Sequence, residues 1–404
     1  MPKAKGHSWQ FKRRFRRNAF GWKSQPAITR LREAVSEIKK VARSDPALGA
    51  EGAVAFIERI SPAIEHVDGS SGSIGAAVNN AIAALVPIMA GAEVDDTTRA
   101  SLLERLYQAH ADDQIPYIEH MADYWGQLCA SRDMASRWAD RLIGTTRLAL
   151  SPDPELRGHY HGSSACLSAL FAAERYDEIV ELLEAEKFWP YKRWAVKALA
   201  ARGDKAEAIR CAEASRSPWA SDLDIDRLCE EILVSSGFTD EAYRRYGLQA
   251  SRAGTYLAWF RAVANKCPDR DKAEILADLV ALTPGEEGKW FAAAKSVGLF
   301  DDALELARRS PTDPRTLTRA ARDFAEKQPA FAAGAGVLAL HWIAHGYGYE
   351  ITGADVLGGY RHAMAAAAND GSVGPTRDRI RTIATSATDG AHFIMRILRG
   401  PLGL

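Results

Sequence analysis

Residues 1–25 combine a run of cations with regularly spaced aromatic side chains. The range carries eight basic residues and no acidic one, whereas the rest of the chain carries 44 basic and 52 acidic residues. On a helix, Phe11, Phe15 and Trp22 would lie along one side, because their spacing follows the helical period. The cations that would cover the remaining circumference are Lys12, Arg13, Arg14, Arg16 and Arg17.

This basic aromatic arm is expected to be a helix that begins at an N-cap, Ser8, and ends at Gly21. It could bind nucleic acid, with arginines on phosphates and aromatic rings stacked on bases. It could instead lie on an anionic membrane or in the groove of a partner. In the third interpretation the aromatic side chains dock on the body and the cations are solvated. The short connection from Gly21 to a helix at Ile28 favours docking. The candidate binding residues are Phe11, Lys12, Arg13, Arg14, Phe15, Arg16, Arg17 and Trp22.

Two histidines, His159 and His161, are the strongest candidates for a metal pair. On a helix, residues two positions apart point about 200° from one another, so both could bind one ion only from an extended loop. Zinc also needs at least three protein ligands, and no third ligand is evident nearby. We therefore expect neither a metal site nor another cofactor.

No residue pattern predicts catalysis. Glu119, His120 and Asp123 share a predicted helix, but they do not form the His-Glu-x-x-His pattern of a zinc peptidase. The sequence also lacks a Gly-x-Ser-x-Gly nucleophile turn. Tyr347 and Glu350 lie in a glycine-rich segment that could gate a groove or simply connect two helices tightly. We expect no enzyme.

One catalytic alternative stays open because tryptophans are frequent in the middle of the chain. A helical-repeat enzyme acting on nucleic acid could hold a base between tryptophans and an acid on its concave face. Large aromatic side chains in helix hairpins also serve as core residues. The tryptophans concerned are Trp189, Trp194, Trp219, Trp259 and Trp290.

The elements that would position these residues are helices. Apolar residues recur at intervals of three and four nearly throughout, as in Ile28, Leu31, Val35 and Ile38. This is the period of helices that bury one face, and alternating strand patterns are nearly absent. The predicted fold class is all-α.

The middle of the chain repeats a turn signal. A small or turn residue is followed by two or three polar residues and then by Ala or Ile, which would open a second helix. The signals begin at Glu174, Gly203, Gly237, Cys267 and Gly298, with the one at Cys267 the weakest, and their spacings are 29, 34, 30 and 31 residues. A period of this length is typical of stacked helix hairpins.

Residues 160–315 resemble degenerate tetratricopeptide repeats. Tyr176 and Phe300 match the aromatic residue that follows the family's turn. The family's small residue is matched by Ala208, Ala242 and Ala303. The Trp-Leu-Gly-Tyr set of the first helix of the repeat is mostly missing. The resemblance implies an α-solenoid of helix hairpins that binds a protein or peptide.

Four regions are expected: the arm at 1–25, an N-terminal helical domain at 26–151, the repeats at 152–315 and a C-terminal helical cap at 316–404. The five cysteines are scattered and form no Cys-x-x-Cys pair, which suits reduced thiols. We see no signal peptide, and the longest apolar stretches fall short of the ~20 residues of a membrane span. A cytoplasmic protein is therefore predicted.

The functional hypothesis is a non-enzymatic scaffold or adaptor that holds a protein segment in its groove. Nucleic-acid binding through residues 1–25 is the alternative, and a repeat enzyme acting on nucleic acid is the third. The sequence does not determine the oligomeric state.

Overall fold

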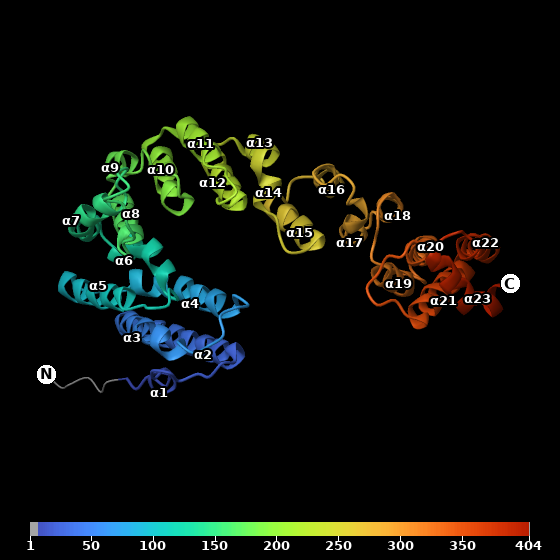
Figure 1. The fold of residues 1–404 in the computed structure, drawn as a ribbon, viewed down its shortest axis with the longest axis horizontal. Coiled ribbons are helices and arrows are strands. Elements are labelled where there is room, and N and C mark those ends of the chain that lie inside the picture. The colour runs from blue at the N-terminus through green and yellow to red at the C-terminus, as the bar shows by residue number, and fades with distance from the viewer. Residues whose placement is uncertain (1–6, 404) are drawn as a thin grey trace. The chain divides into compact units, whose positions relative to one another are not determined.

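The computed structural model describes residues 7–403, so Lys3 and Lys5 of the basic arm lie outside the described residues. The described residues form helices joined by turns and contain no strand, which confirms the all-α prediction (Figure 1). The chain divides into two compact units, Met1–Gly237 and Phe238–Leu404. The four expected regions stay a prediction.

The first unit contains twelve α-helices and one 3-10 helix among its described residues. They are α1 (Phe11–Arg14), α2 (Ser24–Ala42), α3 (Pro46–Ile64), α4 (Ser73–Ala90), α5 (Asp96–Ala111), η1 (Glu119–Tyr124), α6 (Trp125–Cys129), α7 (Arg132–Ala149), α8 (Ser163–Ala172), α9 (Tyr176–Leu182), α10 (Trp189–Arg202), α11 (Lys205–Ala214) and α12 (Asp222–Val234). One continuous apolar core extends from Trp9 to Ala198.

The second unit has shorter helices at its start and longer ones at its end. They are α13 (Thr239–Ala242), a π-helical turn η2 (Tyr243–Gly247), α14 (Leu248–Ala250), α15 (Tyr256–Lys266), α16 (Lys272–Ala281), a 3-10 helix η3 (Glu287–Trp290), α17 (Phe291–Ser296), α18 (Phe300–Arg309), α19 (Pro314–Asp323), α20 (Pro329–Ala344), α21 (Gly353–Asp370), α22 (Val373–Ala384) and α23 (Asp389–Leu402). Helix α20 is buried on nearly all sides and packs against its neighbours α19 and α21.

The predicted hairpin turns occur at four of the five expected positions. Glu174, Gly203, Gly237 and Gly298 have φ angles of 57°, 102°, 82° and 81°, in the left-handed region that ends a helix. At three of them the following amide donates a hydrogen bond back across the turn, as in Asp204 N to Leu199 O at 2.9 Å. The turns at Glu174, Gly203 and Gly298 therefore reverse the chain between two packed helices.

The fifth turn signal, at Cys267, is a different connection. Cys267 ends α15 with a φ of −121°, outside the left-handed region. Asp271 then starts α16 by accepting hydrogen bonds from the amides of Ala273 and Glu274. Ala273 is exposed, whereas the corresponding Ala208 and Ala303 are buried. The cap at Asp271, not a small buried residue, sets where this second helix begins.

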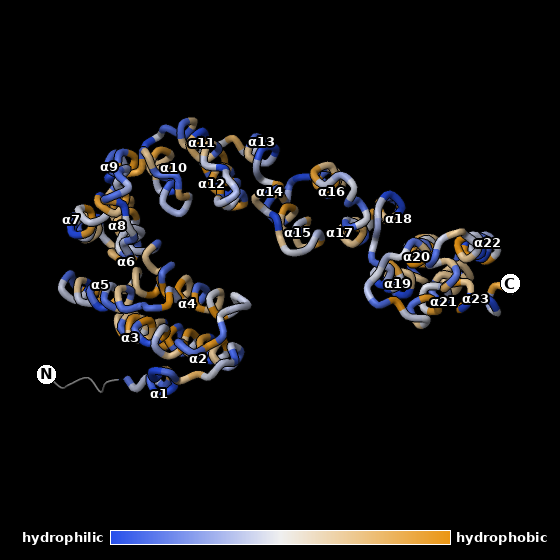
Figure 2. Tube along the Cα trace, in the orientation of Figure 1, coloured by the Kyte–Doolittle hydropathy of each residue, from blue (hydrophilic) through white to orange (hydrophobic). Residues whose placement is uncertain are grey.

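Helices α3 and α4 show mostly apolar colours in Figure 2. By length and composition alone, α4 could cross a membrane, which the sequence analysis did not expect. Buried core helices meet the same two criteria, and the side chains of Ile74, Val78 and Ile82 lie in the apolar core.

Candidate anion-binding groove

A groove of about 530 Å³ runs between α2 and α4 in the first unit, and we call it the α2–α4 groove. Its lining combines apolar, polar and basic side chains but no carboxylate. The lining residues are Leu31, Arg32, Val35, Ser36, Lys39, Lys40, Arg43, Ala77, Asn80 and Ala81. The four cations, Arg32, Lys39, Lys40 and Arg43, are named the groove cations below.

The groove cations follow one side of α2 and continue just past its end. Arg32, Ser36, Lys39 and Arg43 recur at intervals of four, three and four residues, so they form a line along the helix. Eleven residues of helix span about 16 Å. The opposite side of α2 buries Ala27, Ala34 and Ile38 in the core, and the buried Leu31 lies at the floor of the groove. The sequence pattern of one amphipathic helix thus produces an extended row of positive charge.

No nearby acid neutralises this row. Glu33, between the first cations, bonds to Arg14 and Arg30 at 2.6 Å each. The carboxylate of Glu37 accepts hydrogen bonds from the backbone amides of Gln10 and Phe11 at 2.7 and 3.2 Å. Asp45 caps α3 by accepting the amide of Leu48 at 2.9 Å. Within residues 7–403 none of the four groove cations has an ion-pair partner.

The opposite wall of the groove carries no charge either. Helix α4 contains no Asp, Glu, Lys or Arg, and the positions facing the groove are Ala77, Asn80 and Ala81. An apolar wall beside a row of cations strengthens the local field, because fewer polarisable water molecules surround the charges. The arrangement can therefore concentrate an extended anion without a counter-charge from the protein.

The basic arm lies on the other side of α2. Phe11 and Phe15 are buried, and their rings contact the ring of Phe56 edge-on, at centroid distances of 5.2 and 4.9 Å. Glu37 holds the first amides of α1, which fixes the arm to α2. Docking is therefore confirmed for these two aromatic residues, and their rings are covered by protein.

Two predictions about the arm are wrong: that it forms one long helix, and that Trp22 lies on the same side as Phe11 and Phe15. Helix α1 ends at Arg14, and Ser8 does not cap it, since Gln10 precedes the first turn. The amide of Asn18 bonds to the carbonyl of Pro62 at 2.9 Å, so α3 supplies an acceptor that competes with helix continuation. The chain then reaches Trp22, whose side chain is 72% exposed.

The cations of the arm divide into paired and unpaired ones. Arg14 pairs with Glu33, and Arg17 lies 3.9 Å from Glu65. Lys12, Arg13 and Arg16 are exposed and have no ion pair among the described residues. They add to the positive charge of this end of the unit but belong to no groove.

The groove cations were missed in the sequence analysis, although a local signal existed. The apolar stripe through Ile28 and Val35 was recognised, but the basic residues along another side of the same helix were not. The range 7–45 contains eleven cations and three acids. The uncharged stretch 73–90 that forms the facing wall is also visible in the sequence, but its position beside α2 is not.

The other sequence candidates are histidines and an acid–histidine pair that lie in the first unit. The rings of His159 and His161 are 4.7 Å apart, and His161 lies 6.1 Å from His110. In the described part of the chain no group of three His, Cys, Asp or Glu side chains could hold a metal ion. The carboxylate of Asp123 bonds to Arg193 at 2.5 Å and to His120 at 3.3 Å, which is a salt link between η1 and α10.

Of the five tryptophans, only Trp219 is exposed. Trp189, Trp194, Trp259 and Trp290 are at most 5% exposed. The indole nitrogens of Trp259 and Trp290 donate to Leu248 O and Thr283 Oγ1, so both rings are held by local contacts. Four of the five side chains therefore lie in the interior and present no stacking surface.

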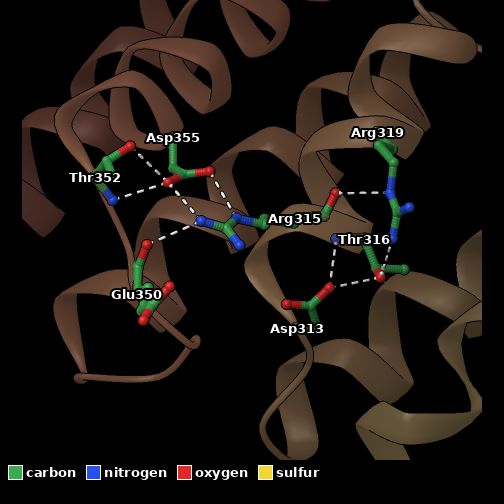
Figure 3. Close-up of polar contacts among 7 residues, drawn as sticks. All are labelled: Asp313, Arg315, Thr316, Arg319, Glu350, Thr352 and Asp355. Carbon is green, nitrogen blue, oxygen red and sulfur yellow. Dashed lines mark hydrogen bonds and ion pairs between the residues drawn. The ribbon is translucent and has the colours of Figure 1, made fainter. Parts of the chain in front are cut away.

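The glycine-rich segment before α21 is a tightly held connection. Figure 3 shows Arg315 between the carboxylate of Asp355 and the carbonyl of Glu350, with distances of 2.9 and 3.2 Å to Asp355 and 2.9 Å to Glu350. Asp355 also accepts the amide and hydroxyl of Thr352 at 2.8 Å each. These bonds lower the pKa of Asp355 to about 2, chiefly through Arg315. The cluster fixes the start of α21.

The Asp355 cluster predicts a pH-dependent contribution to stability. D355N should lower the free energy of unfolding by about 1–2 kcal/mol at pH 7, because a charged hydrogen bond is lost at a partly solvated site. The folded pKa lies below the ordinary value of about 3.9, so the contribution is present above pH 4 and declines as the pH falls towards 2.

Urea unfolding of the wild type and D355N at pH 7 and pH 3 measures this difference. D370N is the control, because Asp370 is exposed on the same helix and has no bonding partner among the described residues. If D355N lowered the free energy of unfolding equally at both pH values, the predicted dependence of this contribution on the ionisation of Asp355 would be contradicted.

Comparison with protein-family models and with curated protein sequences found no match.

Proposed function

We propose that this chain is a non-enzymatic binding protein whose α2–α4 groove holds the backbone of single-stranded nucleic acid. The observation that carries the proposal is the row of four cations without ion-pair partners beside an uncharged wall. Phosphates spaced regularly along a strand complement a row of this kind, and the binding releases condensed counterions. The proposed nucleic-acid site therefore lies on α2 and not on the docked aromatic arm.

Two features favour a nucleic acid over a membrane surface. Insertion into a bilayer interface needs bulky apolar side chains beside the cations. The groove side of α4 presents alanines and Asn80, and none of the large exposed apolar side chains of the described chain lies on α2 or α4. A narrow groove between two helices also suits a single strand, because it can follow the backbone of an extended chain.

The proposal includes a degenerate tetratricopeptide-like α-solenoid as the arrangement of the helix hairpins within each unit. It is supported by the four left-handed turn residues and by the buried small side chains that follow them, Ala208, Ala242 and Ala303. A helix hairpin cannot bury its apolar face alone, so neighbouring hairpins must stack to form a core.

The test is the binding of a labelled short oligouridylate to the full chain, followed by fluorescence anisotropy at several salt concentrations. We expect the logarithm of the affinity to fall with the logarithm of salt with a slope of about −3, from about four phosphate contacts at −0.7 each. A poly-glutamate peptide of equal charge should bind more weakly. The absence of oligouridylate binding at about 0.05 M salt, or equal binding of poly-glutamate, would overturn the nucleic-acid proposal.

A second candidate function, the binding of a protein segment, is favoured by a different surface of the first unit. A groove of about 830 Å³ beside α10 and α11 is lined by two exposed aromatic side chains, Phe188 at 53% and Trp219 at 90% exposure. Exposed rings of this kind accept the apolar and proline side chains of extended peptides. Such a peptide should shift the fluorescence of Trp219, and W219S should abolish that shift.

A further inference from the structure

The second unit contains a separate pocket of about 360 Å³ between α18, α20 and α22. Its apolar surface comes from Val337, Leu338 and Ile383, of which the first two are nearly fully buried. Arg308 and Arg379 approach it from α18 and α22. The volume is at the lower end of the range of small-molecule sites.

The two guanidinium groups converge without a carboxylate in the pocket lining. Desolvation and the nearby charge of Arg308 both lower the pKa of Arg379, so the two cations repel one another. Arg308 bonds to Glu305 at 3.2 Å on its own helix. Arg379 has no ion-pair partner among residues 7–403, because the adjacent Asp378 pairs with Arg381.

The remaining polar groups of the pocket carry no negative charge. Desolvation and the neighbouring His345 lower the pKa of His341, which favours its neutral form. The hydroxyl of Thr382, on the same helix as Arg379, donates to the carbonyl of Asp378 at 3.0 Å. Arg308 and Arg379 are both exposed, so water partly screens their mutual repulsion when the pocket is empty. A bound anion would relieve the repulsion.

We propose that this pocket binds a small carboxylate whose apolar part is a branched aliphatic or aromatic group. The carboxylate would lie between Arg308 and Arg379, since guanidinium groups match carboxylate oxygens in bidentate geometry. The hydroxyl of Thr382 keeps its hydrogen bond to the carbonyl of Asp378 and would not donate to this group. The apolar part would pack on Leu338 and Ile383, which line the same pocket.

The apolar surface distinguishes this ligand class from a simple phosphate. A phosphate ion would use the two arginines but leave the half-buried Ile383 in contact with water. A ligand that covers Val337, Leu338 and Ile383 gains additional free energy from the burial of its own apolar area. The pocket should therefore prefer 3-phenylpropionate to inorganic phosphate, and should reject its neutral amide because Arg379 would stay without an ion-pair partner among the described residues.

Isothermal titration calorimetry of the full chain with 3-phenylpropionate, 3-phenylpropionamide and inorganic phosphate tests the proposal. We expect the carboxylate to bind at least about tenfold more tightly than the other two. R379Q should weaken carboxylate binding at least about tenfold, whereas R377Q should leave it unchanged. Arg377 is a matched control, because it is exposed on the same helix and has no ion pair among the described residues.

Melting curves keep the test independent of a folding defect. R379Q removes the repulsion with Arg308, so its melting temperature without ligand should equal or exceed that of the wild type. Several outcomes would overturn the proposal: no binding of 3-phenylpropionate, equal binding of the amide or of phosphate, or equal losses in R379Q and R377Q. A marked decrease in the melting temperature of R379Q would also contradict it, because Arg379 would then stabilise the fold.

Discussion

Replacement of both Phe11 and Phe15 by alanine should lower the free energy of unfolding of the protein by about 4 kcal/mol or more. Each buried phenylalanine contributes about 3–5 kcal/mol, and the sum is smaller for neighbours that share a cavity. The two side chains are 2% and 1% exposed and both pack on Phe56. Urea unfolding of the full chain, followed by circular dichroism, measures the loss.

The control for this prediction is Trp22, the third aromatic residue of the arm. Its side chain is 72% exposed, so W22A should change the free energy of unfolding by less than about 0.5 kcal/mol. A small effect of the double phenylalanine variant would show that the arm leaves the body in solution. The aromatic residues would then be available to a partner.

Substitution of all four groove cations by glutamine should weaken oligouridylate binding by about 100- to 1000-fold at about 0.1 M salt. The estimate follows from four phosphate contacts, each with a salt exponent of about 0.7 for single strands. The slope of log affinity against log salt should flatten by about 3. Anisotropy titrations at several salt concentrations measure both quantities.

A matched set of four exposed cations in the second unit controls for the loss of net charge. They have no ion pair among the described residues and are Arg261, Lys272, Lys327 and Arg361. Their substitution by glutamine should change affinity less than about threefold. Equal losses from both sets would mean that binding depends on net charge and would contradict a site in the groove.

A third set, Lys12, Arg13 and Arg16, separates the arm from the groove. These cations are exposed and unpaired in the described chain, like those of the groove, but they lie on the docked arm. If the groove is the site, their removal should flatten the salt slope less than removal of the groove cations. A larger effect of the arm set would return the nucleic-acid site to residues 1–25.

The urea midpoint of the groove variant should remain close to that of the wild type. The groove cations are exposed and unpaired in the described chain, so their loss leaves no buried group without a partner. A large decrease would mean that these charges stabilise α2, and the binding loss would then have a structural cause.

The hairpin turns could be predicted from the sequence because they depend on local geometry. A glycine such as Gly203 or Gly298 accepts the left-handed conformation that ends one helix, and the polar residues that follow start the next. Glu174 adopts the same conformation without being glycine, and its position in the repeat identified it. The prediction of a hairpin turn at Cys267 was wrong, because the second helix there begins at a cap formed by Asp271.

The length of the arm helix could not be predicted, because its end depends on groups distant in sequence. The helical spacing of Phe11, Phe15 and Trp22 suggested one continuous helix. Its first amides bind Glu37, and the amide of Asn18 binds the carbonyl of Pro62. These contacts replace helical hydrogen bonds, so the aromatic side chains are buried without a regular helix.

By itself, the sequence determined the all-α fold and most of the hairpin turns, because helical hydrogen bonds and turn conformations involve residues a few positions apart. Only the tertiary structure decided where the α2–α4 groove lies. It places the cations of α2 beside the uncharged helix α4, which begins 49 residues after the start of α2, and directs Glu33 and Glu37 to the arm. The net field of a surface depends on which charges are paired, and pairing between distant residues cannot be read from local spacing.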